Sequence, residues 1–129
     1  MQKIKEDSVV FDGATNLIWQ RSGSKTYLSY ENAKKYINNL NNDGFAGSKN
    51  WRLPTLEEAM SLMETEETNG LFIDPIFDDE KEFIWTADLV EGKPRAAWVV
   101  IFSRRSCGWI ELDLTTYVRA VRSRQSSTE

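Results

Sequence analysis

The residues best suited to chemistry lie near the end of the chain, where polar and apolar side chains alternate. Trp109, Glu111 and Asp113 occupy every second position, with isoleucine and leucine between them. An extended strand would place the tryptophan and both carboxylates on one outer face. A tryptophan ring offers a flat platform for the apolar side of a sugar, and carboxylates accept hydrogen bonds from hydroxyl groups. The pattern therefore predicts a carbohydrate-binding surface.

Two arginines precede this stretch and extend the prediction. Arg104 and Arg105 lie in the loop before the strand, and a guanidinium matches a sulfate, phosphate or carboxylate through paired hydrogen bonds. The loop therefore favours an anionic sugar. The alternative is an ordinary solvated hairpin with the tryptophan folded over the sheet. The complete predicted ligand-binding set is Trp85, Asp88, Arg104, Arg105, Trp109, Glu111 and Asp113.

An acidic run between the two halves of the chain is a candidate metal site. Closely spaced carboxylates can bind calcium, and the candidate ligands here are Asp74, Asp78 and Asp79. The spacing is not that of an EF-hand, and loop carbonyls would have to complete the coordination shell. Calcium is therefore a minor hypothesis, and we expect no other cofactor.

The composition argues against catalysis. The chain contains no histidine, so the usual general base near neutral pH is missing. Its single cysteine, Cys107, precedes a glycine in a predicted strand, where a small packed side chain is more common than a nucleophile. Glu111 and Asp113 have the chemistry for glycoside hydrolysis, but two acids on one strand face are commonplace. We therefore expect a non-enzymatic protein.

Length and charge narrow the remaining classes of protein. The 129 residues correspond to one domain, and the net charge of −4 argues against nucleic acid or an anionic membrane surface as partner. Residues 1–7 contain no apolar segment typical of a signal peptide or anchor. The chain as it stands is expected in the cytoplasm, and outside the cell if it is the mature form of a longer precursor.

The first half of the sequence predicts a hairpin and two helices. Residues 8–12 and 17–20 are short apolar runs separated by a turn-rich spacer. Ser29 can cap a helix that Gly44 ends. Thr55 and Glu58 have the spacing of a capping box, and the apolar stripe that follows extends the second helix to Met63.

The second half predicts strands joined by turns. They cover residues 83–87, 96–102, 107–112 and 117–122. Trp98 lies in the second of these runs, which is apolar on both faces and is predicted to be core. Helices early and strands late indicate an α+β domain with an antiparallel sheet. Residues 1–7 and 124–129 are expected to be flexible.

Several segments recur together, in this order, in one bacterial family. They are Asp12-Gly13 to Gln20, Ala33, Asn38 to Leu40, Trp51 to Thr55, Trp85 to Ala87 and Tyr117 to Arg122. The chain resembles the Lcl C-terminal-domain-like family, a domain of unknown function similar in fold to C-type lectin-like domains and sulfatase-modifying enzymes. The resemblance implies two helices flanking an antiparallel sheet, adjacent first and last strands, and loops that present a ligand surface.

The same resemblance implies which residues are structural and which activities of related proteins this chain is not expected to share. Relatives in bacterial collagen-like proteins are adhesins that bind sulfated glycans, and calcium occurs in proteins of this general fold. This chain has no collagen-like stalk. The sulfatase-modifying enzymes use a pair of cysteines, so their activity is not transferred to it. The residues expected to be structural are Trp19, Trp51, Arg52, Pro54 and Arg119, with Arg52 pairing with Glu57 or Glu58.

Three functions remain in order of preference. The first is a non-enzymatic recognition module that binds a glycan or a protein surface through the late strands and their loops. The second is a structural or assembly domain whose exposed aromatic residues form a homo-oligomer or a partner interface. The third is an enzyme acting on sugar or peptide, which would require a pocket with convergent polar groups.

Overall fold

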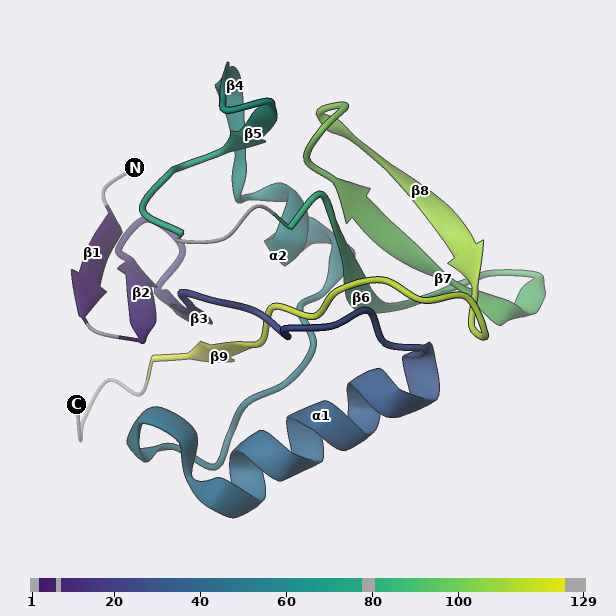
Figure 1. The fold of residues 1–129 in the computed structure, drawn as a ribbon, viewed down its shortest axis with the longest axis horizontal. Helices are drawn as coiled ribbons and strands as arrows, with labels where there is room; N and C mark the ends of the chain where they lie inside the picture. Colours follow the sequence, from purple (N-terminus) through teal and green to yellow (C-terminus); the bar gives the residue numbers. More distant parts are fainter. Residues whose placement is uncertain (1–2, 7, 78–80, 125–129) are drawn as a thin grey trace.

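A computed structural model describes residues 3–6, 8–77 and 81–124 (Figure 1). Two α-helices, a short 3₁₀ helix and nine strands are present in these ranges. In chain order they are β1 Lys3–Glu6, β2 Val9–Asp12, β3 Leu17–Gln20, α1 Tyr30–Asp43, η1 Phe45–Gly47, α2 Leu56–Met60, β4 Met63–Thr68, β5 Leu71–Ile73, β6 Phe83–Val90, β7 Lys93–Ile101, β8 Ser106–Glu111 and β9 Val121–Ser123.

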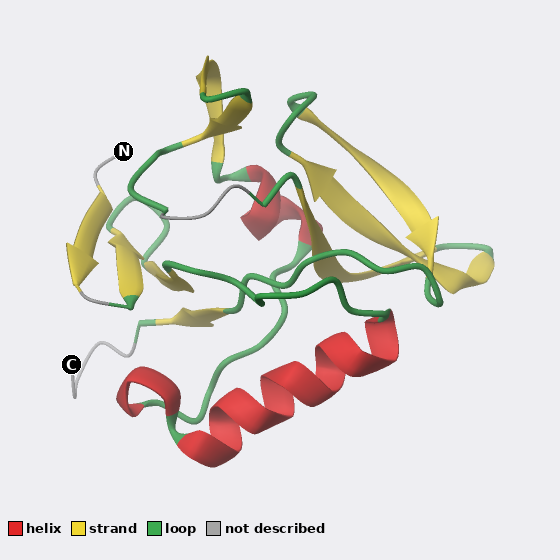
Figure 2. Ribbon diagram, in the orientation of Figure 1, coloured by secondary structure: helices red, strands yellow, loops and turns green. Residues whose placement is uncertain are grey.

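The strands form three antiparallel sheets (Figure 2). The first has the order β1-β2-β3-β9, the second pairs β4 with β5, and the third has the order β6-β7-β8. The α+β class with antiparallel sheets and two α-helices is thereby confirmed. The first and last strands share one sheet, as expected, but as its opposite edges, because β9 pairs with β3.

An irregular segment, residues 116–120, joins the first and third sheets into one layer. Tyr117 forms a bridge to Ile84 of β6, and the Ala120 carbonyl accepts the amide of Gln20 in β3 at 3.0 Å. Neighbouring residues of the strands contribute to two hydrophobic cores on opposite faces of this layer: Ile84 and Trp85 belong to different cores. The sequence shows no polar–apolar alternation in β3 or in the inner part of β7, because both faces of the layer are covered there. No helix among the described residues is long and apolar enough to cross a membrane.

Helix α1 covers one face of the layer and forms for the predicted reasons. The amide of Asn32 donates to the Ser29 hydroxyl at 3.3 Å, and Gly44 ends the helix in the left-handed conformation, with φ of 65°. Tyr30, Ala33 and Ile37 form the buried stripe.

The segment from residue 51 to residue 56 connects the two helices and holds the sheets together. The side chain of Asn41, at the end of α1, accepts a hydrogen bond from the Trp51 amide at 2.7 Å and donates to its carbonyl at 2.9 Å. The Arg52 amide and carbonyl both pair with Val121. The Pro54 carbonyl accepts the Ala87 amide at 2.7 Å. This extended segment thus acts as an extra strand between α1, β9 and β6.

Helix α2 begins where the capping box predicted. The Glu58 amide donates to Thr55 Oγ1, and Glu58 Oε1 accepts the Thr55 amide at 2.9 Å. The same carboxylate accepts two hydrogen bonds from the Arg52 guanidinium, at 2.6 and 2.8 Å. Of the two expected partners of Arg52, the structure therefore selects Glu58.

The second helix is shorter than predicted. It ends at Met60, and Met63 starts β4 instead of extending the helical stripe. The Ser61 hydroxyl donates to the Glu58 carbonyl at 2.6 Å, which closes the last turn. Asn69 and Gly70 both have positive φ and form a two-residue turn between β4 and β5. An Asn-Gly pair is a strong hairpin signal, so this hairpin, which lies outside the predicted strands, has a clear local cause.

The ends of the chain also differ from expectation. Residues 3–6 were predicted to be flexible but form β1, which pairs with β2 along its whole length. Of the strand predicted over residues 117–122, only Val121 and Arg122 belong to β9, because residues 117–120 bridge the two sheets. Residues 125–129 lie outside the described part of the chain.

The double role of Glu58 makes stability depend on pH. Hydrogen bonding to Arg52 lowers the pKa of the Glu58 carboxyl below its ordinary value of 4.5. Since the folded-state pKa is the lower one, this stabilisation is complete above the ordinary value and is lost as pH falls through the lowered one. We predict that Glu58→Gln costs about 1–2 kcal/mol at pH 7, the range of a lost cap, and less near pH 3. Denaturant unfolding of the two proteins at pH 7 and at pH 3 measures the loss of unfolding free energy at each pH.

Glu57→Gln is the matched control for this prediction. Glu57 lies in the same helical turn but is exposed, and it takes no part in the capping box or the contact with Arg52. Its replacement should change stability by a few tenths of a kcal/mol at either pH. A loss in Glu58→Gln that is the same at pH 7 and pH 3 would contradict the role of the Arg52–Glu58 pair.

Gly23 allows two backbones to approach, and a methyl group there should not be tolerated. A Cβ at this position would lie 2.1 Å from the carbonyl oxygen of Val118, in the segment that joins the sheets. We predict that Gly23→Ala lowers the unfolding free energy by about 1–3 kcal/mol, as overpacking does. Gly108→Ala is the control, because its Cβ would meet only a side-chain atom of Ile101 at 3.5 Å. Equal melting temperatures for the two variants would refute this account of Gly23.

Candidate functional site

Two tryptophans lie side by side on the outer part of the β6-β7-β8 sheet. Trp98 of β7 and Trp109 of β8 are direct partners in the antiparallel register, so their side chains project from the same face. Trp109 is 44% exposed and Trp98 is half-buried. We call this partly exposed aromatic surface the Trp98–Trp109 face.

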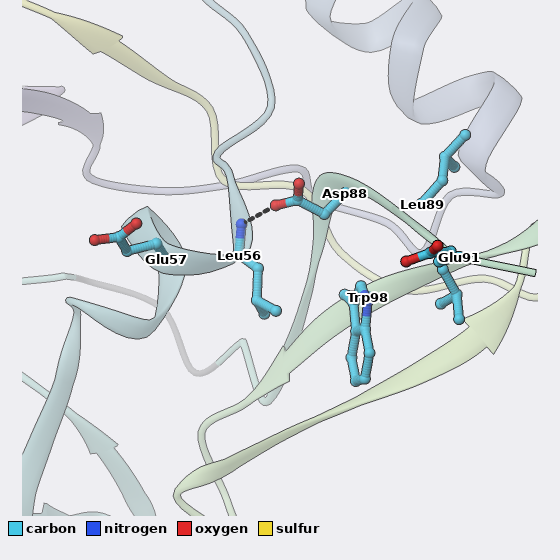
Figure 3. Close-up of a pocket in the computed structure, with 7 residues that line it drawn as sticks. Leu56, Glu57, Asp88, Leu89, Glu91 and Trp98 are labelled. Atoms are coloured by element: carbon cyan, nitrogen blue, oxygen red, sulfur yellow. Dashed lines mark hydrogen bonds between the residues drawn. The ribbon is translucent and has the colours of Figure 1, made fainter.

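A cavity of about 620 Å³ lies beside Trp98, between α2 and the β6–β7 hairpin. In Figure 3, Leu56 of α2 and Trp98 of β7 lie on either side of it, and the Glu57 carboxylate is turned away from Trp98. The cavity is shallow and largely open to solvent. The residues that line it are Leu56, Glu57, Asp88, Leu89, Val90, Glu91 and Trp98.

Asp88 is held in place by the backbone of α2. Its Oδ2 accepts the amide of Leu56, the first residue of the helix, at 2.5 Å (Figure 3). The Asp88 amide donates to Thr86 Oγ1, and that hydroxyl donates to the carbonyl of Trp98. Burial and then the charge of Asp88 raise the pKa of Tyr30. Among the described residues no group donates to Asp88 Oδ1, which leaves this oxygen able to accept a hydrogen bond from a ligand.

The cavity is acidic. Glu57, Asp88 and Glu91 line it, although the Glu57 carboxylate is turned away from Trp98 (Figure 3). No lysine or arginine lines it in the part of the chain that the structure describes. Glu91 occupies the turn between β6 and β7, followed by Gly92 with φ of 80°. Lys93 is nearby, but its Nζ lies 4.6 Å from the centre of the Trp109 ring. Glu111, exposed, extends from the same face as Trp109, opposite Ala96.

Trp85 does not belong to this site, contrary to the sequence prediction. It is fully buried in the core on the α1 side. Its Nε1 donates to the Leu28 carbonyl at 2.7 Å, and its ring meets the edge of Tyr30 with centroids 5.1 Å apart. The indole therefore has no surface or donor left for a ligand.

The two predicted arginines also lie elsewhere. Arg104 and Arg105 form the turn between β7 and β8, whereas Glu111 ends β8 at its opposite end. At about 3.3 Å per residue, the strand separates them by roughly 20 Å. Arg105 Nε donates to the Glu64 carbonyl of β4 at 3.0 Å. The arginines and the carboxylates therefore cannot hold the same small ligand.

Asp113 is separated from Trp109 as well. Strand β8 ends at Glu111, so the alternation that would place Asp113 beside Glu111 is interrupted by a turn. Asp113 Oδ1 instead lies 3.1 Å from Arg95 Nη2, with both side chains well exposed. Together they line a second hollow, at the start of α1 beside Lys34. Of the predicted ligand-binding set, Asp88, Trp109 and Glu111 remain near the Trp98–Trp109 face.

Sequence reasoning placed Trp98 in the core and missed its contact with the cavity. Trp98 is flanked by Ala97 and Val99, both buried, so its neighbours resemble those of a core residue. The turn at Glu91 and Gly92 could have indicated that Trp98 is only partly covered. An acidic turn that contains glycine is typical of the exposed end of a hairpin, where burial is incomplete.

The predicted calcium ligands are only partly described. Asp74 Oδ1 accepts the Ile76 amide at 2.9 Å, as in a tight turn. Asp78 and Asp79 lie outside the described residues. Within the described ranges, no three acidic or cysteine side chains converge as a metal site would require. Calcium binding stays a prediction.

The residues expected to be structural lie in the interior or at its edge. Trp19, Trp51 and Arg119 are almost fully buried, and Pro54 is buried as well. Trp51 Nε1 donates to the Phe45 carbonyl at 2.9 Å. The Arg119 guanidinium donates to the carbonyls of Gln20 and Arg21 and lies over the ring of Phe77. These contacts keep a buried charge hydrogen-bonded inside the fold.

Comparison with known proteins identifies the family of the chain. No curated protein was found to match the chain. The family model of the Lcl C-terminal domain matches residues 8–122, which include both α-helices, the strands from β2 to β8 and the first two residues of β9. The chain therefore belongs to the Lcl C-terminal domain family.

Proposed function

We propose that the chain is a non-enzymatic recognition module of C-type lectin-like fold, which binds a glycan on the Trp98–Trp109 face and in the cavity beside it. The observation that carries the proposal is the pairing of the two tryptophans on one partly exposed sheet face. The fold assignment is supported by terminal strands in one sheet and a helix on each side of the central layer.

The chemistry of the face suits a saccharide. An indole ring packs against the C–H groups of a pyranose, and the polar rim supplies acceptors for its hydroxyl groups. Asp88 Oδ1 and the carboxylates of Glu91 and Glu111 are such acceptors. Since the cavity is largely open to solvent, an oligosaccharide could extend from it across Trp109.

A role without catalysis is supported by the residues at the site. The carboxylate of Asp88 is engaged by the first amide of α2, which is a structural task, and the chain has no histidine that could act as a general base near neutral pH. Recognition requires only complementary shape and hydrogen bonding, which the cavity and the tryptophans offer.

The second candidate is an assembly or partner-binding domain. Strand β8 is an edge of its sheet, and an edge strand can pair with another chain. Leu89, Trp109 and Leu114 are exposed apolar side chains in the late part of the fold. A second copy, or another protein, covering β8 would bury Trp109 and compete with a glycan for it.

The glycan proposal predicts that binding depends on both tryptophans. Trp109→Ala should weaken the affinity for a glycan identified on an array by at least tenfold, which corresponds to about 1.4 kcal/mol. Trp98→Phe keeps a ring in the half-buried position and should weaken binding less. Tyr27→Ala, which removes an exposed aromatic residue outside the site, is the control. Unchanged affinity in a folded Trp109→Ala protein, measured by calorimetry, would remove the proposed surface.

The two candidate functions differ in the predicted mass in solution. If the face binds glycans, light scattering should give the mass of one chain, and Trp109→Glu should leave it unchanged. A stable dimer that dissociates in Trp109→Glu would instead establish the assembly role, because a charge placed in a buried self-contact is costly.

A further inference from the structure

We propose that strand β8 binds an extended segment of a partner protein along its free edge, which adds a strand to the β6-β7-β8 sheet. The segment runs antiparallel to β8, with basic residues at its N-terminal end and acidic residues at its C-terminal end. The inference goes beyond the glycan function and does not depend on it, because it uses the backbone of β8 and the charges at its ends. It also gives the partner-binding alternative one specific kind of partner.

The backbone of β8 has unused hydrogen-bonding groups on the side away from β7, where no described strand follows (Figure 1). The two strands pair along the whole of β8 without a register shift, and just beyond it the Leu112 amide donates to the Arg95 carbonyl. Because bonded and non-bonded residues alternate in an antiparallel pair, the even-numbered residues of β8 bond to β7. The amides and carbonyls of Cys107 and Trp109 and the amide of Glu111 therefore point outward, and among the described residues nothing bonds to them.

The other edges of the described sheets are covered, charged or short, which are the usual protections of an edge strand. The outer edge of β6 bonds to Pro54 and Tyr117, and that of β9 bonds to Arg52. Strand β1 has two lysines and a glutamate, β4 has three glutamates, and β5 has only three residues. Strand β8 has no proline, no bulge and no charge before its last residue. Among the described edges, it is therefore the one that can accept another strand.

Opposite charges at the two ends of β8 determine which segment is complementary. Arg104 and Arg105 lie in the turn before the strand, and Glu111 ends it. All three side chains are exposed, and within the described residues those of Arg104 and Glu111 have no hydrogen bond or ion pair. An antiparallel segment that is basic at its N-terminal end and acidic at its C-terminal end gains an opposite-charge pair at each end. The reversed charge order places like charges together at both ends.

Aliphatic residues suit the middle of the segment. A residue opposite Trp109 exchanges two backbone hydrogen bonds with it, and its side chain lies beside the indole on the same sheet face. Cys107 is exposed on that face as well. A β-branched residue opposite either position therefore extends the apolar surface of the sheet and shields its new hydrogen bonds from water.

A second copy of the chain would offer the same order of charges, because its own β8 runs from arginine to glutamate. Each copy carries a net charge of −4, however, and like net charges disfavour association. A partner segment with balanced charges carries no such cost. The charges therefore favour a different protein over a dimer.

Two blocked octapeptides of equal composition test the charge order. Lys-Lys-Val-Thr-Val-Thr-Glu-Glu places a lysine opposite Glu111, its first valine opposite Trp109 and its glutamates opposite the two arginines. Glu-Glu-Val-Thr-Val-Thr-Lys-Lys reverses the charges. In an NMR titration of the ¹⁵N-labelled chain, we expect the first peptide to bind about fivefold or more tightly than the second, since both end pairs change sign. Salt should reduce the difference.

Amide hydrogen exchange locates the bound peptide on the edge. The amides of Gly108 and Ile110 bond to β7 and should exchange slowly with or without peptide. Those of Cys107, Trp109 and Glu111 should exchange rapidly in the free chain and slow down when the first peptide binds, because it supplies their missing acceptors. Slow exchange of all these amides in the free chain would mean that the edge is already paired, and a doubled mass by light scattering would identify a second copy as its occupant. Either result would overturn the inference.

Two N-methylated forms of the first peptide distinguish strand pairing from attraction between charges alone. A methyl on the nitrogen of its first valine removes the donor to the Trp109 carbonyl and should weaken binding about tenfold or more, because that carbonyl is left unpaired. A methyl on the nitrogen of the next threonine, which faces away from β8, should change binding less than about twofold, because no hydrogen bond is lost. Equal losses in the two forms would overturn the pairing with β8.

A charge exchange in the protein is the reciprocal test. Arg104→Glu combined with Glu111→Lys should reverse the preference between the two octapeptides. The matched control is Asp43→Lys with Lys49→Glu, which exchanges two exposed charges at the end of α1 and after η1 and should leave the preference unchanged. Circular dichroism confirms that both variants are folded. A preference that the first exchange does not reverse would overturn the charge argument, as would equal binding of the two octapeptides.

The inference and the glycan function can fail separately. Failure of both octapeptides to bind a chain whose edge amides exchange rapidly would overturn the inference. Glycan binding that is lost in Trp109→Ala would still support the glycan function in that case. A blank glycan array combined with the expected peptide binding would remove the glycan function and keep the partner segment.

Discussion

The rest of the structure depends on one carboxylate, that of Glu58. It caps α2 through the Thr55 amide and binds both terminal nitrogens of Arg52. The backbone of Arg52 is in turn paired with Val121 of β9. A single side chain therefore fixes the start of the helix against a strand that is distant in sequence. The same contact positions one wall of the cavity, because Leu56, which lines it, lies two residues before Glu58.

Features governed by neighbours in sequence could be predicted. The capping box at Thr55, the cap at Ser29 and the stop at Gly44 all depend on side chains within a few residues of the atoms they contact. The strand pattern of the second half was also visible. These local rules were sufficient for the α+β class, for the β2–β3 hairpin and for the bounds of α1, but not for β1, the β4–β5 hairpin or the end of α2.

Features governed by distant contacts could not be predicted. Arg105 and Glu111 are close in sequence, but an extended strand places them at opposite ends. Trp85 and Trp98 both lie in apolar runs, yet Trp85 faces α1 and Trp98 faces the cavity. Which of them is covered depends on where the helices pack, and that information is not local. Asp88 was predicted to bind a ligand, but its bond to Leu56, 32 positions away in the chain, could not be foreseen.

The short length of α2 explains why the face of the proposed site is uncovered. Five residues of helix span about 7.5 Å, whereas the nine residues of β7 extend over about 30 Å. The helix covers the inner part of the sheet face, at Ile84 and Val100, which are fully buried. The outer part, at Trp98 and Trp109, stays partly uncovered. A longer α2 would extend the core across this face and cover it. The helix that stabilises one side of the sheet therefore also leaves the proposed binding surface open, because it ends early.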